Sequence, residues 1–365
     1  MYHIGMPPNS GILSPSFEQD PEQTLQPSTT VDGLFSIECL RSAIDNKTKP
    51  PGSLGRIEEL ALRIGSLQQT VTPTMKHCRL IIFAGDHGIA ESGVSNFPQE
   101  VTQQMLANFL AGGAAANVFA AALDVEVQVV DAGVANHSII DDQLTMKSLG
   151  QGTANFSVEA ALSGGQFEQA LEHGRELGAA GSCDAVCFGE MGIANTSSAT
   201  MLFHKMIGLP LEKITGRGTG INDAGLAHKL TLLRSAANRT ADRLDAREAM
   251  TEYGGFEIAM MTGAMLGAAS QQRLVLVDGF IATAAATAAM RIDPTVVDAL
   301  VFAHRSAEQG HAAVIDALNI QPLLDLDLRL GEGTGALLAW PLVKCAAAML
   351  CDMASFESAG ISGAV

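Results

Sequence analysis

The feature that most constrains the fold is an alternation of short apolar runs with longer alanine-rich stretches, which begins near residue 78. The runs are rich in Val, Ile and Leu, as is typical of strands that are buried on both faces of a sheet. Neighbouring parallel strands need crossover connections, which helices usually supply. The alternation therefore predicts an α/β fold with a parallel sheet flanked by helices. The predicted strands are residues 79–84, 125–130, 185–188, 274–277 and 299–302.

Polar and glycine-rich residues follow each of these predicted strands. In open α/β sheets, ligands bind beyond the carboxyl ends of the strands, where the connecting loops gather. We therefore expect a binding site along that edge of the sheet. The five loops are Gly85-Asp86-His87-Gly88, Asp131-Ala132-Gly133, Gly189-Glu190-Met191-Gly192, Asp278-Gly279 and His304-Arg305-Ser306.

The N-terminal part of the chain has a different texture. Residues 1–30 are rich in Pro, Ser, Gln and Thr without periodicity, which predicts a loose N-terminal extension. Further along, apolar residues recur at steps of three and four, which predicts a helix with Ser53 as its N-cap. The apolar face of this helix consists of Leu54, Ile57, Ala61, Ile64 and Leu67.

Charge and composition argue against several classes of partner and location. The formal net charge is −17 at pH 7, which disfavours nucleic acid and anionic membranes as partners. The apolar tract at residues 336–356 contains Lys344 and Asp352, so we interpret it as a buried helix. The N-terminal sequence MYHIGMPPNS lacks the features of a signal peptide, and none of the six cysteines forms a C-x-x-C pair. We expect a cytoplasmic protein with free thiols.

Several common nucleotide and metal motifs are missing from the sequence. It contains neither the phosphate-loop pattern G-x-x-x-x-G-K-[ST] nor the dinucleotide pattern G-x-G-x-x-G, which disfavours a kinase and a nicotinamide dehydrogenase. The acidic pair Asp141-Asp142 does not precede the Thr/Gly loop that ordinary phosphoribosyltransferases use. Asp86 and His87 lack further ligands at metal-binding spacing, so we favour a hydrogen-bonding role for them. We predict no metal and no cofactor.

Residues 189–198 have the pattern of a strand, a turn and a helix. Asn195, Thr196 and Ser197 are residue types that cap a helix whatever the function. The alternative is an anion site, because free N–H groups and hydroxyls at a helix start suit a monophosphate. Arg217, within the glycine-rich residues 216–220, and Lys229 after it would supply the positive charge.

Glu332 stands among three alternating glycines in Gly331-Glu332-Gly333-Thr334-Gly335. A carboxylate with so little side-chain cover is expected to face a cavity. The alternative is an acidic residue at a helix N-terminus, stabilised by the helix dipole, because the sequence from Ala336 onward is helical in character.

Five motifs occur in an order that resembles one enzyme family. They resemble nicotinate-nucleotide:dimethylbenzimidazole phosphoribosyltransferases, which assemble the lower-ligand nucleotide of cobalamin, and the resemblance runs from about residue 36 to the end. It implies a Rossmann-like α/β domain at 76–335, a small helical domain from residues 31–75 plus 336–365, and a homodimer. The motifs are Lys49-Pro50-Pro51-Gly52-Ser53-Leu54-Gly55, Ala84-Gly85-Asp86-His87-Gly88, Gly189-Glu190-Met191-Gly192-Ile193, Gly216-Arg217-Gly218-Thr219-Gly220 and Gly331-Glu332-Gly333.

The resemblance also implies roles for individual residues. Glu332 corresponds to the general base, and Glu190 and Lys229 to further active-site residues. Ser306 corresponds to a nucleotide contact and Ser95 to part of the benzimidazole site. The remaining expected substrate-binding residues are Gln104, Gly192, Asn195, Thr196, Arg217, Gly218 and Gly331. One departure is that the family has glycine where Ala194 stands, which predicts a slightly less open phosphate loop.

The chemistry of this family is compatible with a chain that lacks a metal cluster. The ring nitrogen of nicotinate mononucleotide is already cationic, so nicotinate leaves the ribose without metal or acid assistance. The attacking benzimidazole gains positive charge, and a carboxylate takes the proton from its other nitrogen. Phe97, Met105 and Met191 are candidate contacts for the aromatic ring. Two alternatives stay open: a phosphoribosyltransferase for another aromatic base, and a non-catalytic nucleotide-binding regulator.

Overall fold

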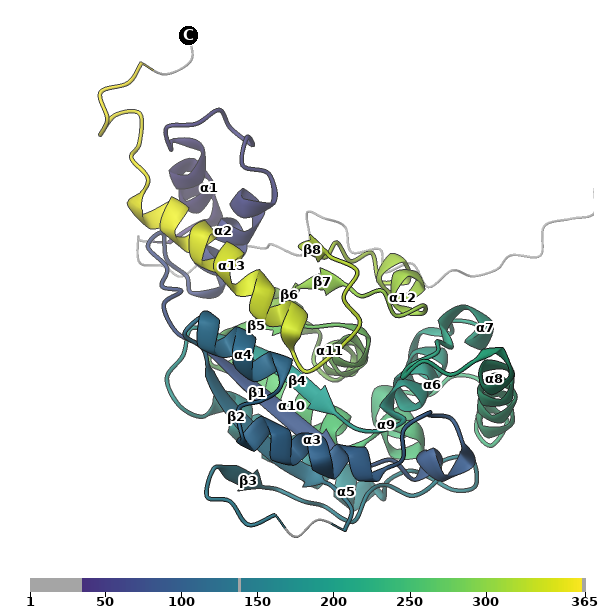
Figure 1. Ribbon diagram of the computed structural model, residues 1–365. Coiled ribbons are helices and arrows are strands. Elements are labelled where there is room, and N and C mark those ends of the chain that lie inside the picture. Colours follow the sequence, from purple (N-terminus) through teal and green to yellow (C-terminus); the bar gives the residue numbers. More distant parts are fainter. Residues whose placement is uncertain (1–34, 137–138, 363–365) are drawn as a thin grey trace, which may run out of the picture.

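The computed structural model describes residues 35–136 and 139–362, so the predicted N-terminal extension lies outside the described residues (Figure 1). The strands are β1 (Cys78–Gly85), β2 (Glu126–Gly133), β3 (Leu144–Met146), β4 (Ala185–Met191), β5 (Leu274–Val277), β6 (Leu300–Phe302), β7 (His304–Arg305) and β8 (Leu324–Asp325). The α-helices are α1 (Ile37–Asp45), α2 (Arg56–Leu67), α3 (Glu100–Leu110), α4 (Ala115–Ala122), α5 (Gly164–Ala179), α6 (Asn195–Ile207), α7 (Leu211–Ile214), α8 (Asp223–Ala237), α9 (Ala246–Tyr253), α10 (Phe256–Ser270), α11 (Phe280–Ile292), α12 (His311–Ala317) and α13 (Thr334–Asp352), and the 3₁₀ helices are η1 (Gly88–Ser92) and η2 (Pro294–Ala299).

Six strands form one parallel sheet in the order β3-β2-β1-β4-β5-β6. This is the Rossmann-like, doubly wound order, in which the chain reverses its direction of growth between β1 and β4. The α/β class with a parallel sheet is therefore confirmed, and each of the five predicted strands is present. The short edge strand β3 was not predicted, because its three residues form no apolar run.

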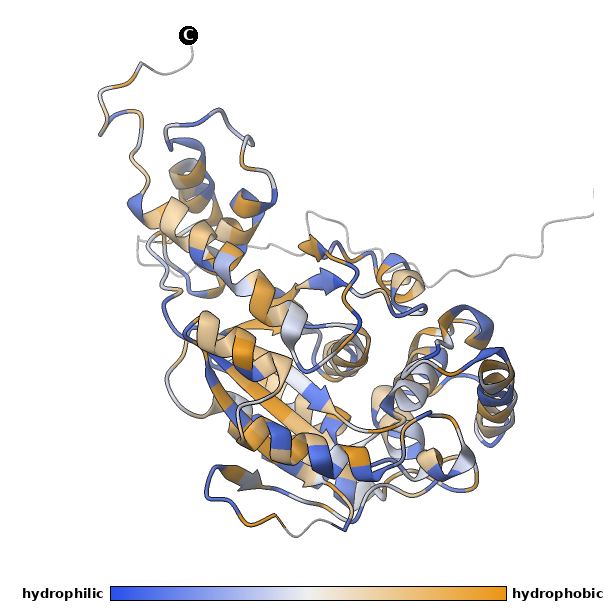
Figure 2. Ribbon diagram, viewed as in Figure 1, coloured by the Kyte–Doolittle hydropathy of each residue, from blue (hydrophilic) through white to orange (hydrophobic). Residues whose placement is uncertain are grey.

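Alternate residues of the central strands face two separate cores. Ile81 and Phe83 of β1 belong to one core, whereas Leu80 and Ile82 belong to the other. Because successive side chains of a strand point to opposite faces, a strand that is apolar throughout needs cover on both sides. Hydropathy colouring shows β1 as mostly hydrophobic between the helices (Figure 2).

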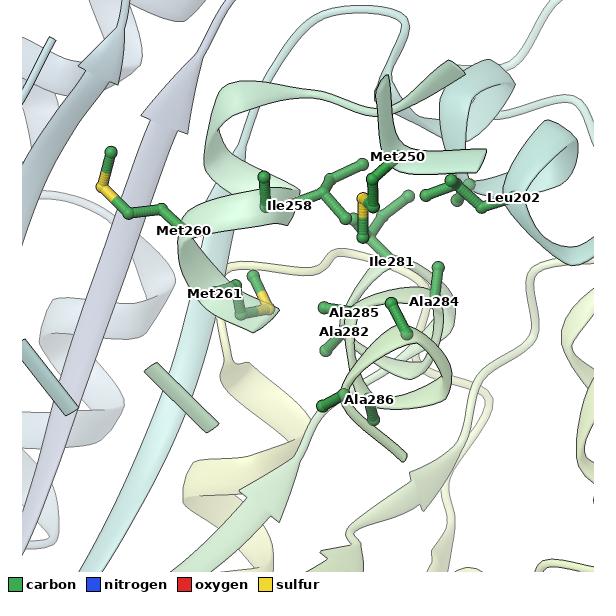
Figure 3. Packing of buried hydrophobic residues seen from close by; sticks show 14 of the residues in the cluster. Leu202, Met250, Ile258, Met260, Met261, Ile281, Ala282, Ala284, Ala285 and Ala286 are labelled. Carbon is green, nitrogen blue, oxygen red and sulfur yellow. The ribbon is translucent and has the colours of Figure 1, made fainter. Parts of the chain in front are cut away.

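Helices α10 and α11 cover one face of the sheet, and α5 packs on α10. Figure 3 shows Met261 of α10 beside the small side chains of Ala282 and Ala285 of α11. The contact between α5 and α10 is closer still: a Cβ at Gly174 would lie 1.9 Å from the Met260 carbonyl oxygen. Small residues therefore let these helices approach backbone to backbone.

The opposite face is covered by α3, α4 and α13, and the same core continues into α1 and α2. Helices from both ends of the described chain thus pack together, α13 against α2 and α2 against α1, while they share a core with the sheet (Figure 1). The division into a small helical domain and an α/β domain stays a prediction.

Two local expectations near the chain ends can be compared with the structure. Helix α2 begins at Arg56 after Gly55, so the prediction of Ser53 as the N-cap was wrong. Residues 51–55 form a turn instead, and Leu54, expected on the apolar face, is exposed. Helix α13 is apolar and long enough to cross a membrane, but 61% of its most apolar stretch is buried in the protein. The stretch Glu100–Ala122 meets the same length and composition test with 28% buried, and the turn after α3 divides it.

Candidate active site

The loops that follow β1, β4 and β5 meet at the point where the sheet order reverses. Gly192, which follows β4, lies so close to Gly85 at the end of β1 that a Cβ would be 2.4 Å from the Gly85 carbonyl oxygen. The turn before α13 crosses the same place, since a Cβ at Gly189 would be 2.3 Å from the Glu332 carbonyl oxygen. This is where ligands bind in doubly wound sheets.

The turn at residues 331–333 holds Glu332 in a conformation that few residues adopt. Glu332 has a φ of 61°, and Gly331 and Gly333 also have positive φ values. This left-handed backbone costs a non-glycine residue roughly 1–2 kcal/mol, so the surrounding contacts must maintain it. Thr334 helps to do so, because its hydroxyl donates a 2.8 Å hydrogen bond to the Gly331 carbonyl oxygen.

The Glu332 carboxyl group is buried and faces the start of another helix. Its Oε2 accepts a 3.3 Å hydrogen bond from the backbone N–H of Ala116, in the first turn of α4. Burial raises the pKa of Glu332, the Ala116 N–H opposes the rise, and the nearby Asp278 adds to it. Since a helix N-terminus stabilises negative charge, Glu332 combines a raised pKa with a place where its anion is tolerated.

Glu190, near the end of β4, lies directly beside the Glu332 turn. A Cβ at Gly331 would be only 2.2 Å from Glu190 Oε1, so only glycine fits there without a shift. Burial of the carboxyl group raises the pKa of Glu190 to about 8, the Asn195 hydrogen bond opposes this, and nearby acidic groups including Glu332 add to it. Glu190 therefore carries a proton at neutral pH.

The start of α6 supports the anion-site interpretation of residues 189–198. No side chain caps this helix; its N-cap is Ala194, with a φ of 76°. Capping by Asn195, Thr196 or Ser197 was therefore the wrong alternative. The Asn195 amide donates a short hydrogen bond to Glu190 Oε2 instead, and Thr196 Oγ1 accepts a 2.9 Å hydrogen bond from Lys229 Nζ. Ala194 stands where the family resemblance led us to expect glycine, and its left-handed backbone is a conformation that favours glycine.

Lys229 brings a buried amine to the start of α6. The side chain has no exposed surface, and burial lowers its pKa to about 8, with Glu308 opposing the shift. Gly218 approaches the same hydroxyl, since its Cβ would lie 2.9 Å from Thr196 Oγ1, and its N–H donates a 3.4 Å hydrogen bond to Glu308. Thr196, Gly218, Lys229 and Glu308 therefore form one cluster.

Arg217 does not point into this cluster. Its guanidinium donates to the Ile221 carbonyl oxygen at 2.9 Å and pairs with the exposed carboxylate of Asp223. In this conformation Arg217 stabilises the 217–223 turn, and the structure does not bring it to Lys229.

Ser306 lies on a rigid polar network below the ends of β5 and β6. Its N–H donates a 2.8 Å hydrogen bond to His311 Nδ1, and His311 Nε2 lies 3.1 Å from Thr283 Oγ1. Burial, His304 and Arg305 lower the pKa of His311 to about 3, so the ring is neutral. A Cβ at Gly279 would be 3.6 Å from Ser306 Oγ, which places Ser306 beside the loop after β5.

The residues expected near the aromatic acceptor lie in the loop after η1, on α3 and at the end of β4. Ser95 Oγ is 3.0 Å from Thr219 Oγ1, so the loop after η1 contacts the glycine-rich segment at 216–220. Gln104 on α3 and Phe97 are exposed, whereas Met105 and Met191 pack against the core formed by α3, α4 and α13.

Sequence reasoning assigned no individual role to three acidic residues that shape this site. Asp278 follows β5 and accepts a 3.0 Å hydrogen bond from the Ala336 N–H at the start of α13; its place after a strand was its only signal. Glu308 had no signal, and Glu257 lies in an otherwise apolar stretch of α10. His87 makes the hydrogen bond expected of it, with Nε2 2.6 Å from Glu257 Oε1.

One surface cavity lies elsewhere. A hollow of about 380 Å³ between α5 and α9 is lined by Phe167, Leu244, Arg247 and Glu168, of which the last two form an ion pair. It contains none of the residues grouped above, so we place the site at the strand ends, where the buried ionisable groups converge.

Comparison with known proteins gives a consistent result over most of the chain. A family model described as phosphoribosyltransferase matches residues 36–361. The nicotinate-nucleotide–dimethylbenzimidazole phosphoribosyltransferases of Aromatoleum aromaticum and Dechloromonas aromatica are each 51% identical, over 90% and 89% of this chain and 96% and 95% of theirs. A crystal structure of CobT from Thermus thermophilus is 40% identical with a TM-score of 0.87, covering 90% of this chain and 99% of that chain. The chain therefore belongs to the nicotinate-nucleotide–dimethylbenzimidazole phosphoribosyltransferase family.

Proposed function

We propose that this chain transfers the 5-phosphoribosyl group of nicotinate mononucleotide to 5,6-dimethylbenzimidazole, which yields α-ribazole 5'-phosphate and nicotinate. The names of the relatives support this reaction. The observation that carries it is the placement of Glu332: a buried carboxyl group with a raised pKa, at the ligand edge of the sheet, beside the N-terminus of α4. Such a carboxylate suits removal of a proton from a flat, weakly acidic heterocycle.

The phosphate of the donor fits the cluster at the start of α6. Free N–H groups at a helix N-terminus bind phosphate, and α6 has no side-chain cap to compete with a ligand. Lys229 and Thr196 supply an ammonium group and a hydroxyl there, and Gly218 lets the backbone of residues 216–220 approach Thr196 closely. The pKa of Lys229, at about 8, keeps most of its population charged at neutral pH.

The acceptor attacks the anomeric carbon through its unprotonated nitrogen, as the bond to the nicotinate nitrogen breaks. The electron pair of that bond neutralises the pyridinium ring, so nicotinate leaves without protonation. Positive charge on the benzimidazole makes its other N–H acidic, and Glu332 takes that proton. Direct displacement converts a β-nucleotide into an α-riboside.

Glu190 is suited to a neutral role beside Glu332. With a pKa of about 8 it keeps its proton at neutral pH, so it does not repel the donor phosphate, the nicotinate carboxylate or the Glu332 anion. Burial raises the pKa of both carboxyl groups, but Glu332 also lies at the N-terminus of α4, which stabilises its anion, so the two groups are suited to separate acid and base roles. Asn195, which donates to Glu190, holds the group in place.

Further expectations follow from the family resemblance and belong to this proposal. Ser95 and Gln104 would contact the benzimidazole, and Ser306, Gly192, Arg217 and Gly331 would line the nucleotide site. Arg217 would have to leave Asp223 to reach a phosphate. We also expect a cytoplasmic homodimer that needs no metal or cofactor.

The proposal is tested with purified protein, nicotinate mononucleotide and 5,6-dimethylbenzimidazole in the presence of a chelator. Chromatography should show release of nicotinate and formation of an α-riboside phosphate. In Glu332→Gln we expect kcat to fall by about 10²–10⁴-fold, because a positioned base contributes that much. Glu172→Gln, an exposed change on α5, is the matched control and should behave as wild type.

The same experiment separates the alternatives. Binding of the nucleotide without turnover with any benzimidazole would favour the non-catalytic regulator. Turnover with a purine or phenol but not with benzimidazoles would favour another acceptor. Full activity of Glu332→Gln would reject Glu332 as the base.

A further inference from the structure

Two fully buried ionisable side chains lie beneath the candidate site, and the proposed chemistry uses neither. His87 follows β1, Glu257 lies in the first turn of α10, and neither side chain has exposed surface. Their Nε2 and Oε1 atoms are 2.6 Å apart. Burying such a pair carries a desolvation cost that the mutual attraction often fails to exceed, so the pair is weak evidence for stability alone. Its contacts indicate another role.

Three glycines enclose the pair. A Cβ at Gly192 would lie 3.3 Å from Glu257 Oε1 and 3.3 Å from the His87 ring, and one at Gly255 would lie 2.3 Å from that ring. A Cβ at Gly85 would be 3.1 Å from Glu257 Oε2. The two side chains therefore fill the space between the end of β1, the end of β4 and the start of α10.

The pair contacts both halves of the site through the backbone. His87 is the N-cap residue of η1, and the chain beyond η1 reaches Ser95 on the acceptor side. Gly192 begins the turn that leads to Asn195 and Thr196 on the nucleotide side. A shift of either side chain would therefore move the loop that carries Ser95 relative to the Gly192 turn.

The pair also acts on Glu190 through its charge. After burial, the charges that raise the pKa of Glu190 are those of Glu257 on α10, Asp278 after β5 and Glu332 before α13, while the Asn195 amide on α6 lowers it. These groups come from α6, α10, the loop after β5 and the turn before α13, the elements around Glu190 that bear most on its pKa. Among these three acidic residues, Glu257 raises the pKa of Glu190 the most.

We propose that the buried His87–Glu257 pair is a positioning unit of the active site, which holds the Gly192 turn against the loop carrying Ser95 and places a negative charge behind Glu190. His87 Nε2 donates to Glu257 Oε1, and the two side chains move as one body. This inference rests on the proposed reaction, so its test includes a readout that needs no turnover.

The test uses the full chain with Glu257→Gln, which keeps the size of the side chain and removes its charge. Infrared spectra recorded across pH follow the protonated carboxyl group of Glu190, assigned by its loss in Glu190→Gln. We expect Glu257→Gln to lower the pH at which Glu190 loses its proton, and to raise KM for nicotinate mononucleotide at least about fivefold. Asp184→Asn removes a carboxylate at the other end of β4, where Asp184 accepts hydrogen bonds from Lys76 and His77, and should change neither quantity.

A lower melting temperature for Glu257→Gln with an unchanged Glu190 titration and unchanged KM would overturn the proposal, because the pair would then be only structural. If Glu257→Gln does not fold, His87→Ala and His87→Gln replace it. Since glutamine still donates to Glu257, we expect His87→Gln to have a KM for the nucleotide near wild type and His87→Ala a raised one. An unchanged KM in a folded His87→Ala would also overturn it. The Glu190 titration in Glu257→Gln tests the positioning role of the pair. The proposed function is tested separately, by turnover of the unaltered chain.

Discussion

Two residues of the candidate site, Glu190 and Lys229, have pKa values that their neighbours in the sequence do not explain. Glu190 and Lys229 both have pKa values near 8, reached from opposite directions because burial disfavours the charged form of each. Below that pH the carboxyl is neutral and the amine is charged, which favours an anionic donor. Above that pH the carboxyl group becomes negatively charged and the amine becomes neutral, and both changes disfavour an anionic donor.

We therefore predict that kcat/KM falls above about pH 8 with the loss of two protons. In Lys229→Arg the guanidinium keeps its charge, so the fall should show only one ionisation, that of Glu190. Glu190→Gln should show only the ionisation of Lys229. The measurement is the pH profile of kcat/KM for nicotinate mononucleotide. A profile that stays flat to pH 9.5, roughly the range over which both groups titrate, would contradict both assignments.

At the scale of elements, the site depends on two glycine-rich turns that touch each other. The turn before α13 packs against β4 at Gly189, and Gly331 packs against the side chain of Glu190. A Cβ at Gly189 would meet the backbone of Glu332, and Gly331 combines its close approach to Glu190 with a φ of 87°. The Glu332 carboxyl group is placed by this contact and by the first turn of α4.

Gly331→Ala should lower kcat/KM by about 10²-fold, because a shift of about 1 Å at a catalytic group has that effect. The added Cβ would lie 2.2 Å from Glu190 Oε1 on a backbone with φ of 87°. Gly181→Ala is the matched control: its φ is 70°, it lies before β4 at the opposite edge of the sheet, and its Cβ meets only the flexible Arg79 side chain. We expect that control to lose stability by roughly 1–2 kcal/mol and to keep its kinetic constants. Equal kinetic losses in both variants would argue that backbone strain alone, and not the contact with Glu190, is responsible.

At the scale of the whole molecule, helices from both chain ends share a core with one face of the sheet. The same core contains Leu40 of α1, Ile64 of α2, Leu80 of β1 and Trp340 of α13. Because α13 begins directly after Glu332, the packing of the terminal helices bears on the position of the proposed base. A continuous core favours cooperative unfolding.

Trp340 is the sole tryptophan of the chain and is 1% exposed, so its fluorescence reports on this core. We predict that the urea transitions followed by Trp340 fluorescence and by far-ultraviolet circular dichroism coincide, because sheet and terminal helices unfold together. A fluorescence transition at lower urea would show that the helical part unfolds on its own, as the predicted division into two domains allows.

The sequence by itself determined the fold class, the positions of the main strands along the chain and the family. It did so because strands that are buried on both faces appear as short apolar runs, and because glycine is used where the backbone approaches another group closely. The position of Glu332 among its glycines was visible for the same reason. Local misjudgements, such as Ser53 as a helix cap, arose where several turn conformations suit the same residues.

Only the tertiary structure decided which groups meet and what charge they carry. The pairing of His87 with Glu257 spans 170 residues of sequence, and Lys229 reaches Thr196 across 33. Asn195 and Thr196 turn toward these partners instead of capping α6. The physical reason is that periodicity and backbone preference are properties of neighbours along the chain, whereas burial, and the pKa values that it shifts, depend on groups brought together by folding.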